Sequence, residues 1–178
     1  MDDNKKETLK IKLASFIYCL ICNIPVCFCL CMTSSLINLS SWEGSKLVID
    51  FGSFNWNGFF ANYVLALTLA MCVGTFVPLT AIGRWFTGLF HVNNDTYKGN
   101  MKYRLLATLI ITCIYYIVIS PTLSIVNGIY FHLSATQILL SLLLQMPFIL
   151  IVGFVSSLIS DLAAYKSAHS IDKRFLAD

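Results

Sequence analysis

Charged residues are scarce in this sequence. Only 12% of its 178 residues are Asp, Glu, Lys or Arg, whereas 57% are hydrophobic. A soluble globular domain is about 25% charged and about 45–50% apolar, and disordered chains are rich in charge and poor in apolar residues. Glycine and proline, at 9 and 4 residues, are too few for a collagen-like or low-complexity chain. These deficits exclude all of those classes and leave an integral membrane protein.

Acidic and basic residues are completely missing from three long segments, residues 13–42, 51–83 and 105–160. A membrane-spanning helix needs about 20 mostly apolar residues, so the third segment is long enough for two helices and a turn. Asn127-Gly128 marks that turn, because both residue types favour turns. The sequence predicts an all-α integral membrane fold with four transmembrane helices, over about residues 13–37, 59–83, 105–126 and 135–160.

Basic residues are nearly absent from one side of this topology. The two tails and the loop between the second and third predicted helices hold 11 of the 12 Lys and Arg residues, and Lys46 lies alone on the other side. The positive-inside rule therefore predicts a plasma-membrane protein with both termini in the cytoplasm. The same loop mixes basic with aromatic residues, which favours anionic lipid as its partner over nucleic acid. We expect no nucleic-acid partner.

The two halves of the chain resemble one another. Ser35-Leu36-Ile37-Asn38 and Ser124-Ile125-Val126-Asn127 each end an apolar segment, and the segments that follow carry Asn62 and Gln137 near their starts. Each half contains two spans, so both halves enter the membrane from the same face and the repeat is parallel. We expect one membrane domain over residues 1–178, made of two repeats at 12–90 and 102–165.

One stretch combines a Trp and an aromatic helix start with small residues and a late proline: Trp56-Asn57-Gly58-Phe59-Phe60-Ala61-Asn62-Tyr63, then Ala66, Ala70, Val77-Pro78 and Arg84. This pattern, clearest over residues 56–84, resembles a short bacterial two-helix membrane family of unknown function. The second half lacks the Trp, and its Pro147 falls before the matching position. The resemblance implies a tandem duplication and an architecture, but no reaction.

The predicted spans contain no Asp, Glu, Lys or Arg. Ionisable residues within a membrane usually mark proton relays and ion sites, so neither is supported. The seven cysteines do not form a metal site either. Five of them lie in the first span, and a helix turns about 100° per residue, so their thiols are spread over two faces of that helix. We expect structural thiols, no metal site, no cofactor and no disulfide. A thiol/quinone redox enzyme is the third hypothesis, although the loops at 38–58 and 127–134 contain no Cys.

Uncharged polar residues accompany one proline in each predicted span. The expected helix kinks are at Pro25, Pro78, Pro121 and Pro147. The candidate residues of a cleft between the helices are Asn23, Thr80, Ser120 and Gln145. Two interpretations remain open: hydrogen bonds that hold the helices together at the kinks, or a polar cleft for a small amphipathic or lipid-like ligand.

Arg84 and Asp161 are the first charged residues after the second and fourth predicted spans. Both spans run in the same direction, so in a parallel repeat their ends can meet. The sequence predicts an ion pair between these two residues.

No catalytic residues emerge from this pattern, and the sequence favours a small multi-pass membrane protein that is not an enzyme. A helper, scaffold or oligomeric subunit is the leading hypothesis, with the lipid bilayer and a second copy or another membrane protein as partners. The alternative is a transporter or a lipid- or small-molecule-binding membrane protein.

The distribution of basic residues generates a direct test. A C-terminal fluorescent reporter that folds only in the cytoplasm should fluoresce, because 11 of 12 basic residues favour that side. The matching fusion to a phosphatase active only outside the cytoplasm should be inactive. A dark reporter with an active phosphatase would reverse the predicted topology.

Overall fold

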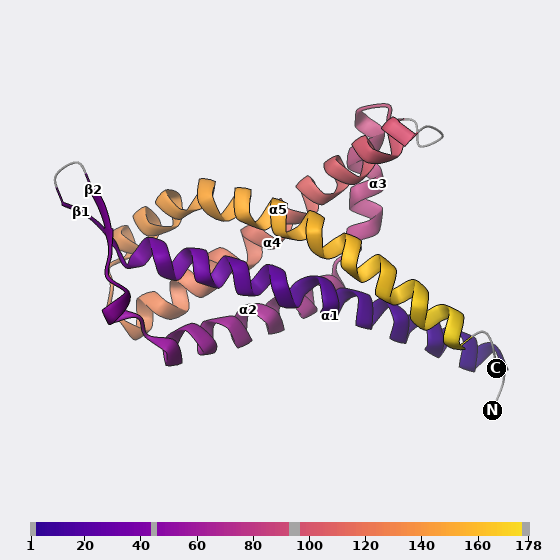
Figure 1. Ribbon diagram of the computed structural model, residues 1–178, viewed down its shortest axis with the longest axis horizontal. Helices are drawn as coiled ribbons and strands as arrows, with labels where there is room; N and C mark the ends of the chain where they lie inside the picture. Colours follow the sequence, from indigo (N-terminus) through magenta and orange to yellow (C-terminus); the bar gives the residue numbers. More distant parts are fainter. Residues whose placement is uncertain (1–2, 44–45, 93–96, 176–178) are drawn as a thin grey trace.

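The computed structural model describes residues 3–43, 46–92 and 97–175 (Figure 1). Its elements in chain order are α1 (Asp3–Asn38), β1 (Ser40–Glu43), β2 (Lys46–Ile49), the short 3-10 helix η1 (Phe51–Ser53), α2 (Trp56–Phe76), α3 (Leu79–Leu89), α4 (Tyr97–Tyr130) and α5 (Ala135–Phe175). Four of these helices are long and apolar enough to cross a membrane, within residues 16–38, 56–76, 99–130 and 135–161. The all-α membrane fold with four spanning helices is therefore confirmed.

The four long helices pack side by side. α1 and α5 make the most extensive contact, α1 also packs on α2, and α5 packs on α4. The four helices thus form a ring in the order α1, α2, α4, α5. Within this ring, α2 and α4 are the neighbours with the least contact. α1 begins and α5 ends at one end of the molecule, here called the terminal end, and the β1–β2 hairpin lies at the other, here called the hairpin end (Figure 1).

The segment between α1 and α2, whose structure the sequence leaves undecided, forms an antiparallel hairpin and a turn. Ser40 pairs with Ile49 at the open end of the hairpin. Hydrogen bonds from the Ser53 hydroxyl and the Gly52 N–H hold the pKa of Asp50 below its usual value. The Asn55 side chain then accepts a hydrogen bond from the Gly58 N–H at 3.0 Å and caps α2.

The predicted second span, residues 59–83, is wrong at its end, because the chain breaks at Pro78. Val77 is extended (φ −94°, ψ 128°), as a residue before proline prefers, and α2 has already ended at Phe76. The three other prolines lie inside continuous helices. After the break α3 turns away from α2 (Figure 1) and packs on α4. Gly83 lies at this contact, where a Cβ would be 3.5 Å from the Ala107 Cβ, an ordinary van der Waals distance.

The predicted turn at Asn127-Gly128 is also displaced. α4 continues to Tyr130, and the chain reverses afterwards through His132, which has a positive φ of 53°. Gly128 is buried, and a Cβ at this position would lie 2.2 Å from Ile138 Cδ1. This glycine therefore serves close packing of α5 on α4 rather than the turn.

The two halves differ in structure. The contact of α1 with α5 is far more extensive than that of α2 with α4, although a twofold axis would relate these pairs. Pro78 also breaks the chain after α2, whereas Pro147 leaves α5 continuous. The repeats at 12–90 and 102–165 stay a prediction.

Small side chains dominate the core of the bundle. The buried cluster consists of Cys27, Cys31, Phe59, Ala66, Ala70 and Ile119. All seven cysteines are free thiols. Small residues allow membrane helices to approach closely, and Gly74 shows how closely, because a Cβ there would lie 2.4 Å from Cys19 Sγ and 3.2 Å from the Tyr115 hydroxyl oxygen.

Gly74→Ala should lower the free energy of unfolding by about 1–3 kcal/mol, because the added methyl group overpacks this contact. Gly88→Ala is the matched control: it lies in α3 with nothing within 4 Å of its Cβ position, and the gain in helix propensity should stabilise it by up to about 1 kcal/mol. Reversible unfolding in mixed micelles measures both. Equal effects of the two substitutions would contradict the packing assigned to Gly74.

Candidate functional site

A cavity of about 840 Å³ lies between α1, α2, α4 and α5 near the hairpin end. Its apolar lining includes the buried side chains of Cys27, Cys31, Phe59, Ala66 and Ile119. Uncharged polar side chains also line it: Ser34, Ser35, Asn38, Ser53, Asn55, Asn57, Asn62, Ser120, Ser124, Asn127, Ser141 and Gln145, with Tyr115, Tyr116 and Tyr130. In the described part of the chain, no Asp, Glu, Lys or Arg contributes to this wall. The cavity is lined by apolar and uncharged polar side chains, with no charged side chain among those described.

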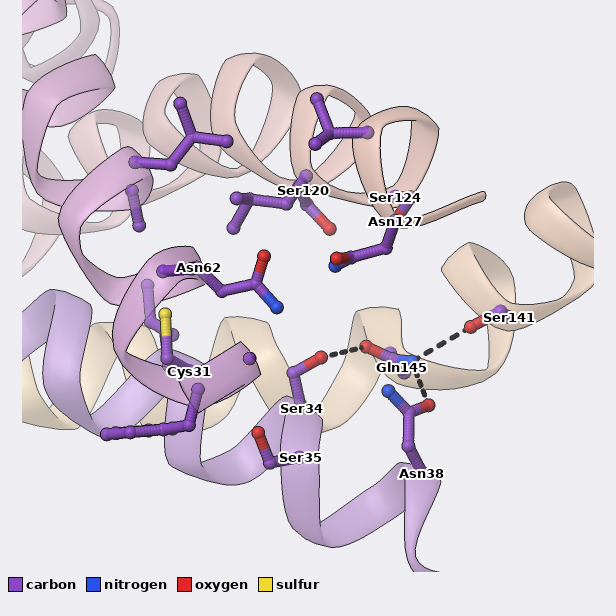
Figure 2. Close-up of a pocket in the computed structure, with 18 of the residues that line it drawn as sticks. Cys31, Ser34, Ser35, Asn38, Asn62, Ser120, Ser124, Asn127, Ser141 and Gln145 are labelled. Carbon is purple, nitrogen blue, oxygen red and sulfur yellow. Dashed lines mark hydrogen bonds between the residues drawn. The ribbon is translucent and has the colours of Figure 1, made fainter. Parts of the chain in front are cut away.

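Gln145 is the centre of a hydrogen-bond network on one side of the cavity. It is 7% exposed, and its Oε1 accepts from the Ser34 hydroxyl at 2.7 Å. Its Nε2 donates to Asn38 Oδ1 and to Ser141 Oγ, both at 2.9 Å (Figure 2). Because the network joins α1 to α5, it fixes the two helices that also contact each other most extensively.

Two further carboxamides point into the cavity from the opposite helices. Figure 2 shows Asn62 of α2 and Asn127 of α4 directed toward one another across the open space. Neither side chain has a hydrogen-bond partner among the residues that the structure describes. Both residues are half-buried, and their free donors and acceptors are available to a ligand.

Two of the four predicted cleft residues are in this cavity and two are not. Ser120 and Gln145 line it. Asn23 lies one turn before Cys27 in α1 and bonds within its own helix, donating to the Cys19 carbonyl oxygen at 2.9 Å. Thr80 is exposed on α3 at the terminal end. Neither residue lines the cavity, because proximity to a proline does not decide which helix face a side chain occupies.

The sequence did contain a signal for the missing residues. Asn38, Asn62 and Asn127 stand near the helix ends that the repeat pattern singled out, and all three line the cavity. Gln137, the fourth residue of that pattern, instead caps α5, because its Oε1 accepts from the Ser134 N–H at 2.9 Å. Amides at the ends of apolar segments were thus better indicators of the site than polar residues beside prolines.

The predicted pair of Arg84 and Asp161 is wrong. Asp161 instead binds the Arg104 guanidinium of α4 and accepts a hydrogen bond from the Tyr18 hydroxyl of α1. Arg84 is exposed on α3, and its Nε donates to the Thr80 carbonyl oxygen at 3.4 Å. Arg84 lies on α3, which follows the break at Pro78 and packs on α4, and Asp161 pairs with Arg104 of α4 instead.

No group of three or more His, Cys, Asp or Glu residues that could hold a metal ion occurs within residues 3–43, 46–92 and 97–175. No protein-family model, curated protein or solved structure matches this chain. The resemblance to a two-helix membrane family stays a prediction, and function has to be argued from the geometry of the cavity.

Gln145→Leu should lower the free energy of unfolding by about 1–2 kcal/mol, because it removes three hydrogen bonds and leaves Ser34, Asn38 and Ser141 without their partner. Met146→Leu is the control, since Met146 is exposed on the same helix and the change conserves volume. Unfolding in mixed micelles measures both variants. A Gln145→Leu protein as stable as the control would show that the network contributes nothing.

Proposed function

We propose that this protein binds an uncharged amphipathic, lipid-like molecule in the cavity at its hairpin end. The observation that carries the proposal is an uncharged cavity of about 840 Å³ in which the unpartnered carboxamides of Asn62 and Asn127 face one another and apolar side chains also line the wall. Ligand cavities usually measure about 300–1,000 Å³ and combine apolar walls with a few polar groups that fix orientation. A headgroup between the carboxamides and a chain against the apolar wall would use both surfaces.

The absence of charge around the cavity selects against ionised ligands. An ionised group loses much of its hydration in an apolar site and needs an opposite charge to compensate. The described wall supplies none. Phosphate and carboxylate headgroups are therefore poor ligands, and neutral headgroups are favoured.

The proposal places the protein in the plasma membrane with both termini in the cytoplasm, as the basic residues favour. The hairpin end, and the cavity with it, then belongs to the extracytoplasmic half of the bilayer. Exposed Arg84 and Trp85 on α3 lie at the cytoplasmic interface in this orientation, where a basic and an aromatic side chain suit contact with anionic lipid.

A binding role needs no catalytic group, and it fits the leading hypothesis of a non-enzymatic helper, scaffold or subunit. The cavity occupies only one end of the bundle. The helix surfaces that face outward remain strongly apolar, with side chains such as Ile117, Leu139 and Ile151 exposed to the bilayer or to another membrane protein. The protein could then hold its ligand for a second copy or a different partner.

Filling the cavity tests the proposal. A long-chain alcohol with a photoreactive diazirine in its chain should label peptides of α2 and α4 in the native protein in phosphatidylcholine nanodiscs. Ser124→Trp places a large ring in the cavity and should reduce this labelling at least about tenfold, because even a few lost contacts change affinity by that factor. The labelled peptides are measured by mass spectrometry.

Ile125→Trp is the matched control. It introduces the same ring at the next residue of the same helix, where the Ile125 side chain is 51% exposed and outside the cavity wall. Its labelling should equal that of the native protein. Equal labelling of the Ser124→Trp and Ile125→Trp proteins would overturn the proposed function.

A further inference from the structure

The hydrogen-bonding groups of the cavity divide into a satisfied set and a free set. Gln145 uses both of its N–H donors and accepts from Ser34. Asn38 accepts from Gln145, but within the described residues its own Nδ2 has no acceptor. Asn62 and Asn127 keep their whole carboxamides free, as far as the structure describes the chain. The free set therefore contains acceptors as well as donors.

The placement of this free set determines what can reach it. Asn62 and Asn127 approach from α2 and α4, on opposite sides of the cavity, and Asn38 belongs to the Gln145 network (Figure 2). α2 and α4 are also the neighbouring helices with the least direct contact. A headgroup between them would bond to both helices and complete this side of the bundle.

The chemistry of the carboxamide selects the headgroup. Each Asn offers two N–H donors and one oxygen acceptor. Quinones, ketones and esters have acceptors only, so they would leave Asn62 Oδ1 and Asn127 Oδ1 unpaired. A hydroxyl group both donates and accepts. Two or more hydroxyl groups on one headgroup can satisfy carboxamides on both walls together.

We infer that the ligand carries a neutral headgroup with several hydroxyl groups, of the glycerol or sugar type, which Asn62 and Asn127 bind from opposite walls. This inference rests on the proposed function and specifies its ligand class. Charged phospholipids are excluded by the uncharged wall. Acceptor-only lipids are disfavoured because sites built to bond a hydroxyl group discriminate strongly against analogues that lack it.

The test compares three probes with the same diazirine-bearing chain: a monoacylglycerol, an alkyl glucoside and a fatty-acid methyl ester. The full-length protein in phosphatidylcholine nanodiscs is labelled at equal probe concentration in the membrane. At least one of the two hydroxylated probes should label the cavity peptides about tenfold more than the ester. The stronger of the two shows whether glycerol or sugar is the source of the hydroxyl groups.

Asn62→Leu and Asn127→Leu should each reduce labelling by the hydroxylated probe toward the level of the ester. Labelling by the ester should stay unchanged, which shows that the variants remain folded with an open cavity. Thr122→Val is the matched control on α4, because the Thr122 hydroxyl donates to the carbonyl oxygen of Val118 in its own helix, at 2.7 Å. It should leave the ratio of the probes unchanged.

The outcomes separate the inference from the proposed function. Equal labelling by ester and hydroxylated probes, or a ratio that survives both Asn substitutions, would overturn the inference and leave the proposed binding role standing. If no probe labels the cavity of the native protein above the level of the Ser124→Trp variant, then both are overturned.

Discussion

The bilayer requires every backbone polar group to find its hydrogen-bond partner within the protein. Each long helix meets this requirement through its own backbone hydrogen bonds. The arrangement of the helices relative to one another therefore depends on bonds between their side chains. Gln145 joins α1 to α5 at the hairpin end through Ser34 and Asn38, and Asp161 joins α5 to α4 and α1 near the terminal end. α5 is thus tied to its neighbours α1 and α4 at two separate positions along its length.

Pro78 is the place where a helix ends early, and several features follow from that break. A proline supplies no N–H and clashes with the preceding turn. α3 then leaves the direction of α2 and packs on α4 through Gly83. Arg84 moves with α3, which is why its expected partner Asp161 is bound by Arg104. A prediction that placed the second and fourth spans in equivalent positions of a parallel repeat could not anticipate this exchange, because it assumed that the second span continues as one helix to residue 83.

The sequence predicts the positions of the spanning helices well, because each depends on one segment alone. It predicts contacts between helices poorly, because each depends on two segments. Gaps between charged residues identified all four spans, because the cost of charge within a bilayer acts locally. Which residues line the cavity depends on which helix faces face each other. Of the four residues proposed from the sequence, Ser120 and Gln145 line it, whereas Asn23 and Thr80 do not. The position of the turn at Asn127-Gly128 was mispredicted for a similar reason, because Gly128 is needed for contact with Ile138 rather than for chain reversal.

The cavity itself follows from the size of the side chains around it. Cys27, Cys31 and Ala66 are small side chains of the core that line the cavity between the four long helices without filling it. Larger apolar residues would close such a space and stabilise the bundle, since packing is the main force between membrane helices. Instead Asn62 and Asn127 project into it. Features that lower stability without a structural benefit are expected at functional sites, and binding of a hydroxylated lipid-like molecule would supply the missing contacts.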